Sequence, residues 1–336
     1  MRRIIARAKE IASMKVAIID DYQNAVRTLD CYPKLQGHEV TVFSEPDTDL
    51  LRIADRLKGF EAVLLTQQRT RFTREMLERA SGLRLISQTG AATAHIDVAA
   101  CTERGVLVSA GGGGLSSSTA ELTWALILAA VRHIPYEVEQ LKKGKWQTTL
   151  GMSLHGKTLG IYAYGRIGSI VAQAGRAFGM NVVCLGRGAS MEKARAAGFA
   201  AAASREAFFE SADIVSLHLP LNADTRGIVK AEDLARMKPS ALLVNTSRSG
   251  LIGDAVLVQA LKNGRPGRAA VDVYDHEPVL NAGNPLIGLD NVLCTPHLGY
   301  VARENYEAYY GTAIDQIVAF AQGKPINVAN PDVLKK

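Results

Sequence analysis

The sequence predicts an α/β protein with two Rossmann-like, doubly wound parallel-sheet domains and a cleft between them. Short apolar, β-branched segments alternate with amphipathic segments along the chain, which is typical of the strands and helices of parallel α/β units. This alternation runs through two regions, before and after a glycine-rich segment at residues 111–118. The length of 336 residues is also about that of two domains.

Five strands are predicted in the first region, which begins near residue 14. Each is a short apolar segment with polar residues or turn formers close to its ends. They are Val16–Ile19, Glu39–Phe43, Ala62–Thr66, Arg84–Ser87 and Val106–Ser109. The segment 111–118 (GGGGLSSS) then allows two interpretations, a flexible linker or a hinge between domains. After it, residues 119–145 have the pattern of one long helix, which Gly144 ends.

Six strands are predicted in the second region, and helical segments separate the first five of them. The six are Leu159–Ala163, Asn181–Leu185, Ile214–Leu219, Ala241–Asn245, Ala269–Tyr274 and Asn291–Cys294. Six strands that alternate with helices match the doubly wound fold that binds dinucleotides. Residues 303–322 are again helical and are expected to return to the first domain. We therefore expect a substrate-binding (catalytic) domain at 14–116 plus 303–336, a dinucleotide-binding domain at 117–302, and a disordered extension at 1–13.

Composition and charge argue against several other classes of protein. The net charge is +6. Residues 1–13 hold four basic groups and one acid, so this short segment carries a net charge of +3, half of that total. Because no basic run with interleaved aromatics follows, we expect no nucleic-acid partner. The longest apolar stretch, residues 124–131, is far shorter than the roughly 20 residues of a membrane span, and residues 1–13 lack the apolar core of a secretory signal. A cytoplasmic protein without a membrane partner is expected.

Metal and disulfide sites are not expected either. The four cysteines are far apart in the chain and include no Cys-x-x-Cys pair, and the histidines lack the spacing of metal ligands. The cysteines are Cys31, Cys101, Cys184 and Cys294.

Residues 151–158 (GMSLHGKT) match the pattern of a phosphate-binding P-loop. Such a loop follows a strand and opens a helix, because amide groups at the helix start bind the phosphates. Here the motif follows a helical segment and precedes a predicted strand. A P-loop ATPase is therefore the disfavoured interpretation of this segment.

A second nucleotide motif lies in the expected context, between a predicted strand and a predicted helix. It is a G-x-G-x-x-G turn in which Ala163 replaces the first glycine. The second glycine, Gly165, would let the backbone approach a pyrophosphate, and the third, Gly168, would let helix and strand pack closely. Ala163 is tolerable if its φ angle is negative. The candidate cofactor residues of this turn are Tyr164, Gly165, Arg166, Ile167 and Gly168.

The end of the next strand bears on the choice between NAD and NADP. An acid is expected there to bind the adenosine ribose of NAD, but the positions hold Gly186 and Arg187. Without the acid nothing repels a 2′-phosphate, and Arg187 could pair with one. NADP is therefore favoured, and the alternative is that both residues only form a turn and NAD binds.

From residue 14 onward the chain resembles the D-isomer-specific 2-hydroxyacid dehydrogenases, a family that includes phosphoglycerate dehydrogenases and glyoxylate or hydroxypyruvate reductases. The motifs that carry the resemblance are Gly156–Gly160 (GKTLG), Tyr164–Gly168 (YGRIG), Asn245–Gly250 (NTSRSG), Val271–Pro278 (VDVYDHEP) and Thr295–His297 (TPH). The resemblance implies a hydride transfer between a nicotinamide dinucleotide and the 2-carbon of a D-2-hydroxy acid or 2-oxo acid. It also implies a homodimer, formed through the helix at 119–145.

The resemblance places the family's catalytic residues at Arg248, Glu277 and His297. The planar guanidinium of Arg248 suits a carboxylate and a neighbouring carbonyl oxygen. His297 is the natural general acid, since histidine titrates near neutral pH, and a carboxylate such as Glu277 beside it would favour the imidazolium form.

Further contacts are implied only by the match to the family. For the cofactor these are Leu219, Pro220, Thr225, Thr246, Ser247 and Asp272, the last of which should face the nicotinamide carboxamide. For the substrate carboxylate they are Gly90, Ala91, Ala92 and Arg248.

The substrate is expected to be a neutral or small hydroxy acid. Phosphoglycerate-oxidising members place arginines near the substrate phosphate, and the corresponding positions here hold Gln67 and Gln88. Arg69 and Arg71 stand nearby, but the second should point away if the strand pleat continues. Two alternatives stay open, a D-3-phosphoglycerate dehydrogenase proper and a non-enzymatic protein that senses dinucleotides.

Overall fold

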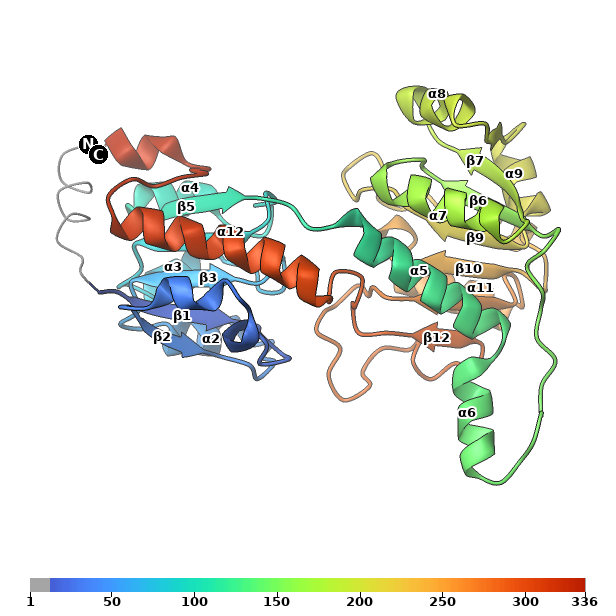
Figure 1. The fold of residues 1–336 in the computed structure, drawn as a ribbon, viewed down its shortest axis with the longest axis horizontal. Helices are drawn as coiled ribbons and strands as arrows, with labels where there is room; N and C mark the ends of the chain where they lie inside the picture. Colours follow the sequence, from blue (N-terminus) through green and yellow to red (C-terminus); the bar gives the residue numbers. More distant parts are fainter. Residues whose placement is uncertain (1–12, 336) are drawn as a thin grey trace. The chain divides into compact units, whose positions relative to one another are not determined.

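A computed structural model describes residues 13–335 of the chain, which is drawn in Figure 1. The extension expected at 1–13 therefore lies, except for Ser13, outside the described residues. The chain divides into two compact units at Leu115/Ser116 and at Val301/Ala302. Unit 1 contains both ends of the chain, and unit 2 contains the segment between the two crossings.

Unit 1 is built on a five-stranded sheet in the order β2-β1-β3-β4-β5, in which all the strands are parallel. The strands are β1 (Lys15–Ile19), β2 (Glu39–Val42), β3 (Ala62–Leu65), β4 (Leu85–Thr89) and β5 (Leu107–Gly111). All five were predicted to within about two residues at each end. Four of them bury nearly all of their residues, whereas β2, at one edge of the sheet, has no fully buried residue.

Helices cover both faces of the unit 1 sheet (Figure 1). On one face an apolar cluster joins the strands to α2 (Leu50–Arg56), α3 (Arg74–Arg79) and α4 (Val98–Glu103). On the other face lies the tail helix, α12 (Arg303–Ala321), which packs on β3, β4 and β5. The short 3-10 helices of this unit are η1 (Val26–Thr28), η2 (Tyr32–Leu35) and η4 (Pro331–Lys335).

The glycine-rich segment is not the flexible linker that its composition allows. Gly111 ends β5, and residues 116–118 already belong to the next helix. A Cβ added at Gly111 would lie 2.6 Å from the side chain of Asn327, and one at Gly112 would lie 2.6 Å from Thr312 Oγ1. These glycines are therefore required by close packing against the chain's last helix and tail. The hinge at this segment stays a prediction.

Unit 2 is built on a seven-stranded parallel sheet in the order β12-β11-β10-β9-β6-β7-β8. The strands are β6 (Thr158–Tyr162), β7 (Asn181–Leu185), β8 (Ala200–Ala201), β9 (Ile214–Leu217), β10 (Leu242–Asn245), β11 (Arg268–Val271) and β12 (Val292–Cys294). Six of them were predicted, and the two-residue β8 is too short to leave a pattern. The order reverses between β6 and β9, which is the position where sheets of this class bind ligands.

Helices cover both faces of the unit 2 sheet (Figure 1), and one apolar cluster lies on each face. One face holds α5 (Ser116–Val131), α7 (Arg166–Ala177) and α8 (Gly188–Ala196), and the other holds α9 (Arg205–Ser211), α10 (Ala231–Arg236) and α11 (Asp254–Lys262). The prediction of two doubly wound parallel sheets is thus confirmed.

The long helix predicted at 119–145 is in fact two helices, α5 and α6 (Ile134–Lys142). His133 separates them with a left-handed φ of 52°. Pro135 lies in the first turn of α6 and cannot continue the hydrogen bonding of α5. Arg268 stabilises the break, because its guanidinium donates to Ala130 O (3.2 Å) at the carboxyl end of α5.

The P-loop-like segment 151–158 does not bind phosphate through its amides. Gly156 N donates to Gly179 O (2.9 Å), Lys157 N to Leu154 O (3.0 Å) and Thr158 N to Asp213 Oδ2 (2.9 Å). The segment leads into β6 instead of following a strand. This position in the fold, like the sequence context, disfavours a P-loop ATPase.

Buried histidines make the free energy of unfolding depend on pH. Burial lowers the pKa of His95 and the pKa of His218 to about 4, below the ordinary value near 6.5. Both rings are therefore neutral in the folded protein, and their contribution is complete above pH 6.5 and lost as the pH falls toward 4. At pH 5 each histidine is expected to cost about 2 kcal/mol of stability. Urea unfolding at pH 7 and pH 5 measures this, and the variant with His95→Gln and His218→Gln should show a smaller difference. Equal stability of the natural chain at both pH values would contradict the burial argument.

Candidate active site

The candidate residues of unit 2 gather at the carboxyl edge of its sheet. Because all seven strands are parallel, the residues that follow β6, β7, β9, β10, β11 and β12 lie along the same edge. These segments hold nearly all the residues predicted from the sequence, including Arg248, Glu277 and His297.

Arg248 stands just after β10, where it precedes the short 3-10 helix η3 (Ser249–Leu251). The turn before it is held by Asn245, whose Nδ2 donates to Arg248 O (3.0 Å) and whose Oδ1 accepts from Ser247 N (3.1 Å). The Arg248 side chain is exposed, and its Nη1 donates to Ser247 O (2.7 Å). No carboxylate neutralises this guanidinium within residues 13–335, so its charge is available to an anionic ligand.

Glu277 and His297 form a close pair, with 2.6 Å between Glu277 Oε2 and His297 Nδ1. An ionised carboxylate can only accept, so Nδ1 carries the proton of this bond. The other oxygen, Glu277 Oε1, accepts from Tyr274 N (2.8 Å), which fixes the carboxylate in place. Within the described chain no group hydrogen bonds to His297 Nε2. Nε2 is therefore the atom of the ring that can exchange a proton with a ligand.

The loop that carries His297 is held in an uncommon conformation. His297 has a φ of 53°, a left-handed angle that a side chain rarely adopts, and its N–H donates to Thr295 O (3.0 Å). The ring of Tyr300 meets the imidazole edge to face, with 5.3 Å between the ring centres. Such a conformation persists only where neighbouring contacts over-determine it, and it is common at functional sites.

The turn between β6 and α7 fits a bound dinucleotide. A Cβ added at Gly165 would meet nothing within 4 Å, so the backbone there is open to a ligand. A Cβ added at Gly168 would overlap the carbonyl oxygen of Ala163, so helix and strand are packed as closely as the motif requires. No side chain caps the first turn of α7, which leaves its amide groups to bind phosphate. Two other residues of the turn differ in their exposure to solvent. Arg166 is exposed, whereas Tyr164 is buried and its N–H donates to Ser190 Oγ (2.9 Å).

Ala163 departs from the expected backbone. The sequence argument required a negative φ at this position, but the angle is 76°. The turn thus has the geometry for which the motif uses glycine, and alanine occupies it under strain.

Ala163→Gly is therefore expected to stabilise the chain. Relief of the left-handed strain outweighs the extra freedom of glycine in the unfolded chain, for a net gain of about 0.5–1 kcal/mol. Urea unfolding measures the gain. As a matched control, Ala177→Gly at the end of helix α7 should lower stability, because the helical angle favours alanine. A less stable Ala163→Gly variant would contradict the strain.

Arg187 follows β7 and occupies the N-cap position of α8. Its side chain is exposed, and its Nη1 lies 4.0 Å from Asp224 Oδ2. A Cβ at Gly186 would lie 3.1 Å from Ser190 Oγ, the atom that accepts from Tyr164 N. An acid at position 186 would therefore disturb this bond. The end of β7 presents a cation that pairs with Asp224, and no acid at position 186, where the ribose ligand was expected.

Asp272 is held by three hydrogen bonds from the segment around His297. It is completely buried, and its two oxygens accept from Thr295 Oγ1 (2.7 Å), Leu298 N (2.7 Å) and Gly299 N (2.8 Å). Its carboxylate thus clamps the segment on both sides of His297. Burial raises its pKa, and the donors around it oppose that shift. Its expected contact with the nicotinamide carboxamide stays a prediction.

Other predicted cofactor residues also tie loops together. Thr225 Oγ1 donates to Pro220 O (2.6 Å), which closes the turn after Leu219, and Ser247 Oγ donates to Leu219 O (2.5 Å). Thr246 is buried, and its hydroxyl lies 2.7 Å from that of a residue on α5. The loops after β9 and β10 therefore form one hydrogen-bonded group.

The predicted substrate loop belongs to unit 1. Gly90 follows β4 with a φ of 91°, and its N–H donates to Gly111 O (3.1 Å). Ala91 and Ala92 are exposed at the carboxyl edge of that sheet. The loop thus presents backbone to solvent where ligands of such sheets bind.

The two glutamines that replace arginines are neutral, and their side chains differ: that of Gln88 is hydrogen bonded, whereas Gln67 Nε2 is buried without a partner among the described residues. Gln88 is buried, and its Nε2 donates to Gln67 O (2.9 Å) and to Thr89 O (2.9 Å). The nearby Arg69 donates to Asp20 O and to Tyr306 Oη. Positions 67 and 88 therefore lack the positive charge that arginines would offer a phosphate ligand.

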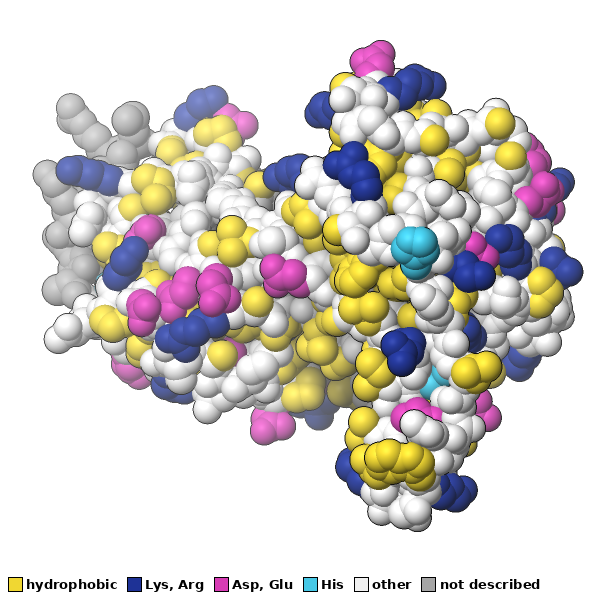
Figure 2. Space-filling model, turned by 45° about the vertical axis from the view of Figure 1, so that its right-hand side comes forward, with side chains coloured by type: hydrophobic (Ala, Val, Ile, Leu, Met, Phe, Trp, Pro, Cys, Tyr) yellow, Lys and Arg dark blue, Asp and Glu magenta, His cyan; other side chains and the backbone are white. Residues whose placement is uncertain are grey.

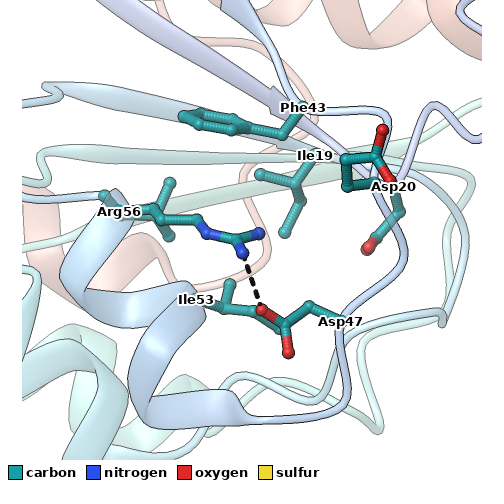
Figure 3. A pocket seen from close by; sticks show the side chains of 8 residues that line it. Ile19, Asp20, Phe43, Asp47, Ile53 and Arg56 are labelled. Atoms are coloured by element: carbon teal, nitrogen blue, oxygen red, sulfur yellow. Dashed lines mark ion pairs between the residues drawn. The ribbon is translucent and has the colours of Figure 1, made fainter.

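A small pocket in unit 1 lies beside the ends of β1 and β2 (Figure 3). Phe43 and Ile53 line it, and Arg56 pairs with Asp47 at 2.9 Å. Burial raises the pKa of the neighbouring Asp20. Arg52 Nε lies 2.8 Å from the same Asp47 oxygen, so Arg56 shares its carboxylate with a second arginine.

Three further findings concern the described residues. Residues 13–335 contain no group of three or more His, Cys, Asp or Glu side chains arranged to hold a metal ion. All four cysteines are free thiols. No helix of this described range combines the length and apolarity that a bilayer crossing needs.

Sequence reasoning missed the polar residues that hold the loops in place. Thr119 and Thr123 on α5, Ser190 on α8 and Asn222 in the turn before Thr225 all hydrogen bond to loops at the carboxyl edge. The available signal was the presence of threonine, serine and asparagine near strand and helix ends. Their partners are far away in the chain, so only the fold identifies them.

The fold and the site define a dinucleotide-binding protein of the doubly wound α/β class, with an Arg–Glu–His set at the ligand edge of the second sheet. The family model for the D-isomer specific 2-hydroxyacid dehydrogenase, NAD binding domain, matches residues 124–299. The chain is 39% identical over 271 residues to a glyoxylate reductase from Aeropyrum pernix, covering 78% of this chain and 80% of that one. The chain belongs to the family of D-isomer specific 2-hydroxyacid dehydrogenases.

Other relatives carry a different name. The chain is 39% identical over 264 residues to a D-3-phosphoglycerate dehydrogenase from Methanocaldococcus jannaschii, covering 78% of this chain but only 50% of that one. It thus spans about half the length of that relative. A solved structure of a phosphoglycerate oxidoreductase from Vibrio cholerae is 48% identical, with a TM-score of 0.88 over 92% of this chain and 99% of that one.

Proposed function

We propose that the chain is an oxidoreductase that interconverts a 2-oxo acid and a D-2-hydroxy acid with a nicotinamide dinucleotide. The observation that carries the proposal is the 2.6 Å contact between Glu277 and His297, at the same sheet edge as the unpaired Arg248. The hand of the product follows the name of the family.

Each residue of this set has one role in the proposal. Arg248 binds the substrate carboxylate and the 2-oxo oxygen through its planar fork. His297 Nε2 gives a proton to that oxygen during reduction and takes it back during oxidation. Glu277 holds Nδ1–H, which fixes the tautomer and orients the ring. When bound, the dinucleotide supplies the hydride that reaches the 2-carbon. Gly90, Ala91 and Ala92 bind the substrate carboxylate through their backbone.

The substrate is a 2-oxo acid without a phosphate group. Gln67 and Gln88 supply no charge, and Arg69 is already hydrogen bonded to Asp20 O and Tyr306 Oη. Phosphate recognition commonly relies on arginine or lysine. The relatives named for phosphoglycerate define the alternative that an experiment must exclude.

A substrate panel tests the proposal. Oxidation of NADPH, and separately of NADH, is followed by nicotinamide absorbance with glyoxylate, hydroxypyruvate, pyruvate, phenylpyruvate or phosphohydroxypyruvate. We expect turnover of one or more of the four unphosphorylated acids, with phosphohydroxypyruvate as a poor substrate. A preference for phosphohydroxypyruvate would make the chain a phosphoglycerate dehydrogenase. No oxidation of either cofactor with any of the acids would count against the reductase.

NADP is the proposed cofactor, supported by the exposed Arg187 and the absence of an acid at Gly186. The natural chain should bind NADPH more tightly than NADH. Arg187→Ala should weaken NADPH by about tenfold, as for loss of an ion pair with a phosphate, and leave NADH nearly unchanged. Arg195→Ala, on the exposed part of α8, is the matched control. Tighter binding of NADH by the natural chain would contradict the proposal.

A homodimer is proposed through the segment that contains α6 and the residues after it. Figure 2 shows apolar side chains gathered on this projecting segment. Trp146 is 76% exposed and Leu150 is 95% exposed, beside a groove lined by Leu128, Val131 and Phe178. Exposed apolar surface of this kind marks an interaction site. Light scattering should give a dimeric mass for the natural chain and a monomeric mass for the variant with Trp146→Ala and Leu150→Asp. A monomeric natural chain would refute the interface.

A further inference from the structure

Two threonines one turn apart on α5 reach the loops that carry the candidate catalytic residues. Thr119 Oγ1 donates to Gly299 O (2.9 Å), in the loop after His297. Thr123 Oγ1 lies 2.7 Å from Thr246 Oγ1, two residues before Arg248, and 2.8 Å from Thr119 O. The contact with Thr119 O is an ordinary bond within the helix, but the other two join α5 to separate loops.

Proton counting sets the direction of the contact between the two hydroxyls. A threonine hydroxyl has one proton, and Thr123 donates its proton to Thr119 O. Thr246 must therefore donate to Thr123 Oγ1. Thr123 is completely buried, so no water competes for this bond. Thr246 is left with free lone pairs, and it can only accept a hydrogen bond from a ligand.

The His297 loop is held between α5 and Asp272. Gly299 N donates to Asp272 Oδ2 (2.8 Å), while Gly299 O accepts from Thr119. A Cβ at Gly299 would lie 3.3 Å from Asp272 Oδ2 and 3.3 Å from Thr119 Cγ2, so the residue has little room to move. Both backbone groups of Gly299 are thus bound, and His297, two residues earlier, is kept at its left-handed angle.

We propose that Thr119 and Thr123 are positioning residues: through Gly299 the first fixes the loop that presents His297, and through Thr246 the second fixes the loop that presents Arg248. The inference rests on the proposed function for what His297 and Arg248 do. Helix α5 then fixes the positions of both the proton donor, His297, and the residue that binds the substrate carboxylate, Arg248.

Threonine-to-valine variants test the two positions separately. Thr119→Val keeps the shape but removes the hydroxyl, and it should lower kcat by about 10- to 100-fold, as for a small displacement of a catalytic group, with little change in the KM of the 2-oxo acid. Thr123→Val should instead raise the KM of the 2-oxo acid, which Arg248 binds, and weaken cofactor binding at Thr246, each by about fivefold, as for loss of one hydrogen bond that fixes this loop. Thr119→Ser and Thr123→Ser keep the hydroxyl and should restore each value.

A matched control uses the other unit of the chain. Thr102 Oγ1 donates to Val98 O (2.9 Å) within α4, the same kind of helix bond, and Thr102→Val should leave kcat and cofactor binding unchanged. If valine at position 119 prevents folding, Thr119→Ala removes the same hydroxyl without its bulk and carries the same expectation.

A second readout needs no activity. In protein with labelled histidine, the NMR signal of the His297 imidazole should shift in Thr119→Val but not in Thr119→Ser or Thr102→Val. If the natural chain reduces no 2-oxo acid, the proposed function fails while this signal still reports on positioning. An unchanged NMR signal of His297 together with unchanged kcat, KM and cofactor binding in both folded valine variants would overturn the inference.

Discussion

Replacing His297 by alanine is expected to lower turnover by about 10²- to 10⁴-fold, as for the loss of a positioned general acid. The reason is that Nε2 is the ring atom left free when Nδ1 binds Glu277 at 2.6 Å. Cofactor affinity should change little, because the ring lies on the loop after β12, away in the sequence from the turn at β6. Steady-state kinetics and a cofactor titration measure both effects.

His276→Ala is the control for this prediction. His276 is exposed, stands beside Glu277 in the chain and has no place in the proposed set. Its removal should leave turnover within about twofold, as for most surface substitutions. Full activity in His297→Ala, or an equal loss in His276→Ala, would contradict the assignment of the general acid.

The second large effect is expected from Gly168→Ala. The added Cβ overlaps the carbonyl oxygen of Ala163, so helix α7 must move away from β6. Overpacking of this kind costs about 1–3 kcal/mol of stability, and the displaced helix start should also lose the dinucleotide. Urea unfolding and a cofactor titration report the two consequences.

Gly165→Ala separates cofactor binding from folding. Its φ is negative and its Cβ would meet nothing within 4 Å, so stability should stay within about 0.5 kcal/mol of the natural chain. The methyl group would occupy the space through which the backbone approaches the pyrophosphate, and the cofactor should bind at least about tenfold more weakly. Natural affinity in Gly165→Ala would show that the dinucleotide does not bind at this turn.

The strands could be predicted because parallel strands bury continuous apolar segments that stand out in a sequence. Eleven segments were assigned, and each corresponds to a strand of the two sheets. The positions of Arg248, Glu277 and His297 came from the resemblance, and parallel topology explains why residues so far apart in the chain share one edge.

The errors have physical reasons in particular residues. The glycine-rich segment was open to a linker interpretation because its partners, Asn327 and Thr312, come from the end of the chain. The break at His133 had a local signal in Pro135 that the apolar pattern outweighed. The sign of φ at Ala163 depends on the packing of α7 against β6, which no local pattern reports.

The candidate site shows the same limit. The candidate catalytic residues could be identified from motifs, but the hydrogen bonds that hold them in position could not be predicted. Asp272 was predicted as a cofactor contact from the resemblance, but the hydrogen bonds by which its carboxylate holds the loop around His297 had no signal in the sequence. Thr119 and Thr123 were not singled out, because their role depends on loops more than 100 positions away in the chain.

The most direct test of the central claim follows the hydride itself. Cofactor deuterated at the transferable position of the nicotinamide ring is incubated with the chain and the best 2-oxo acid of the panel, and the product is examined by mass spectrometry and chiral chromatography. We expect the product to be a D-2-hydroxy acid with one deuterium at the 2-carbon. Consumption of the cofactor without deuterium in the product, or a product of the L hand, would contradict it.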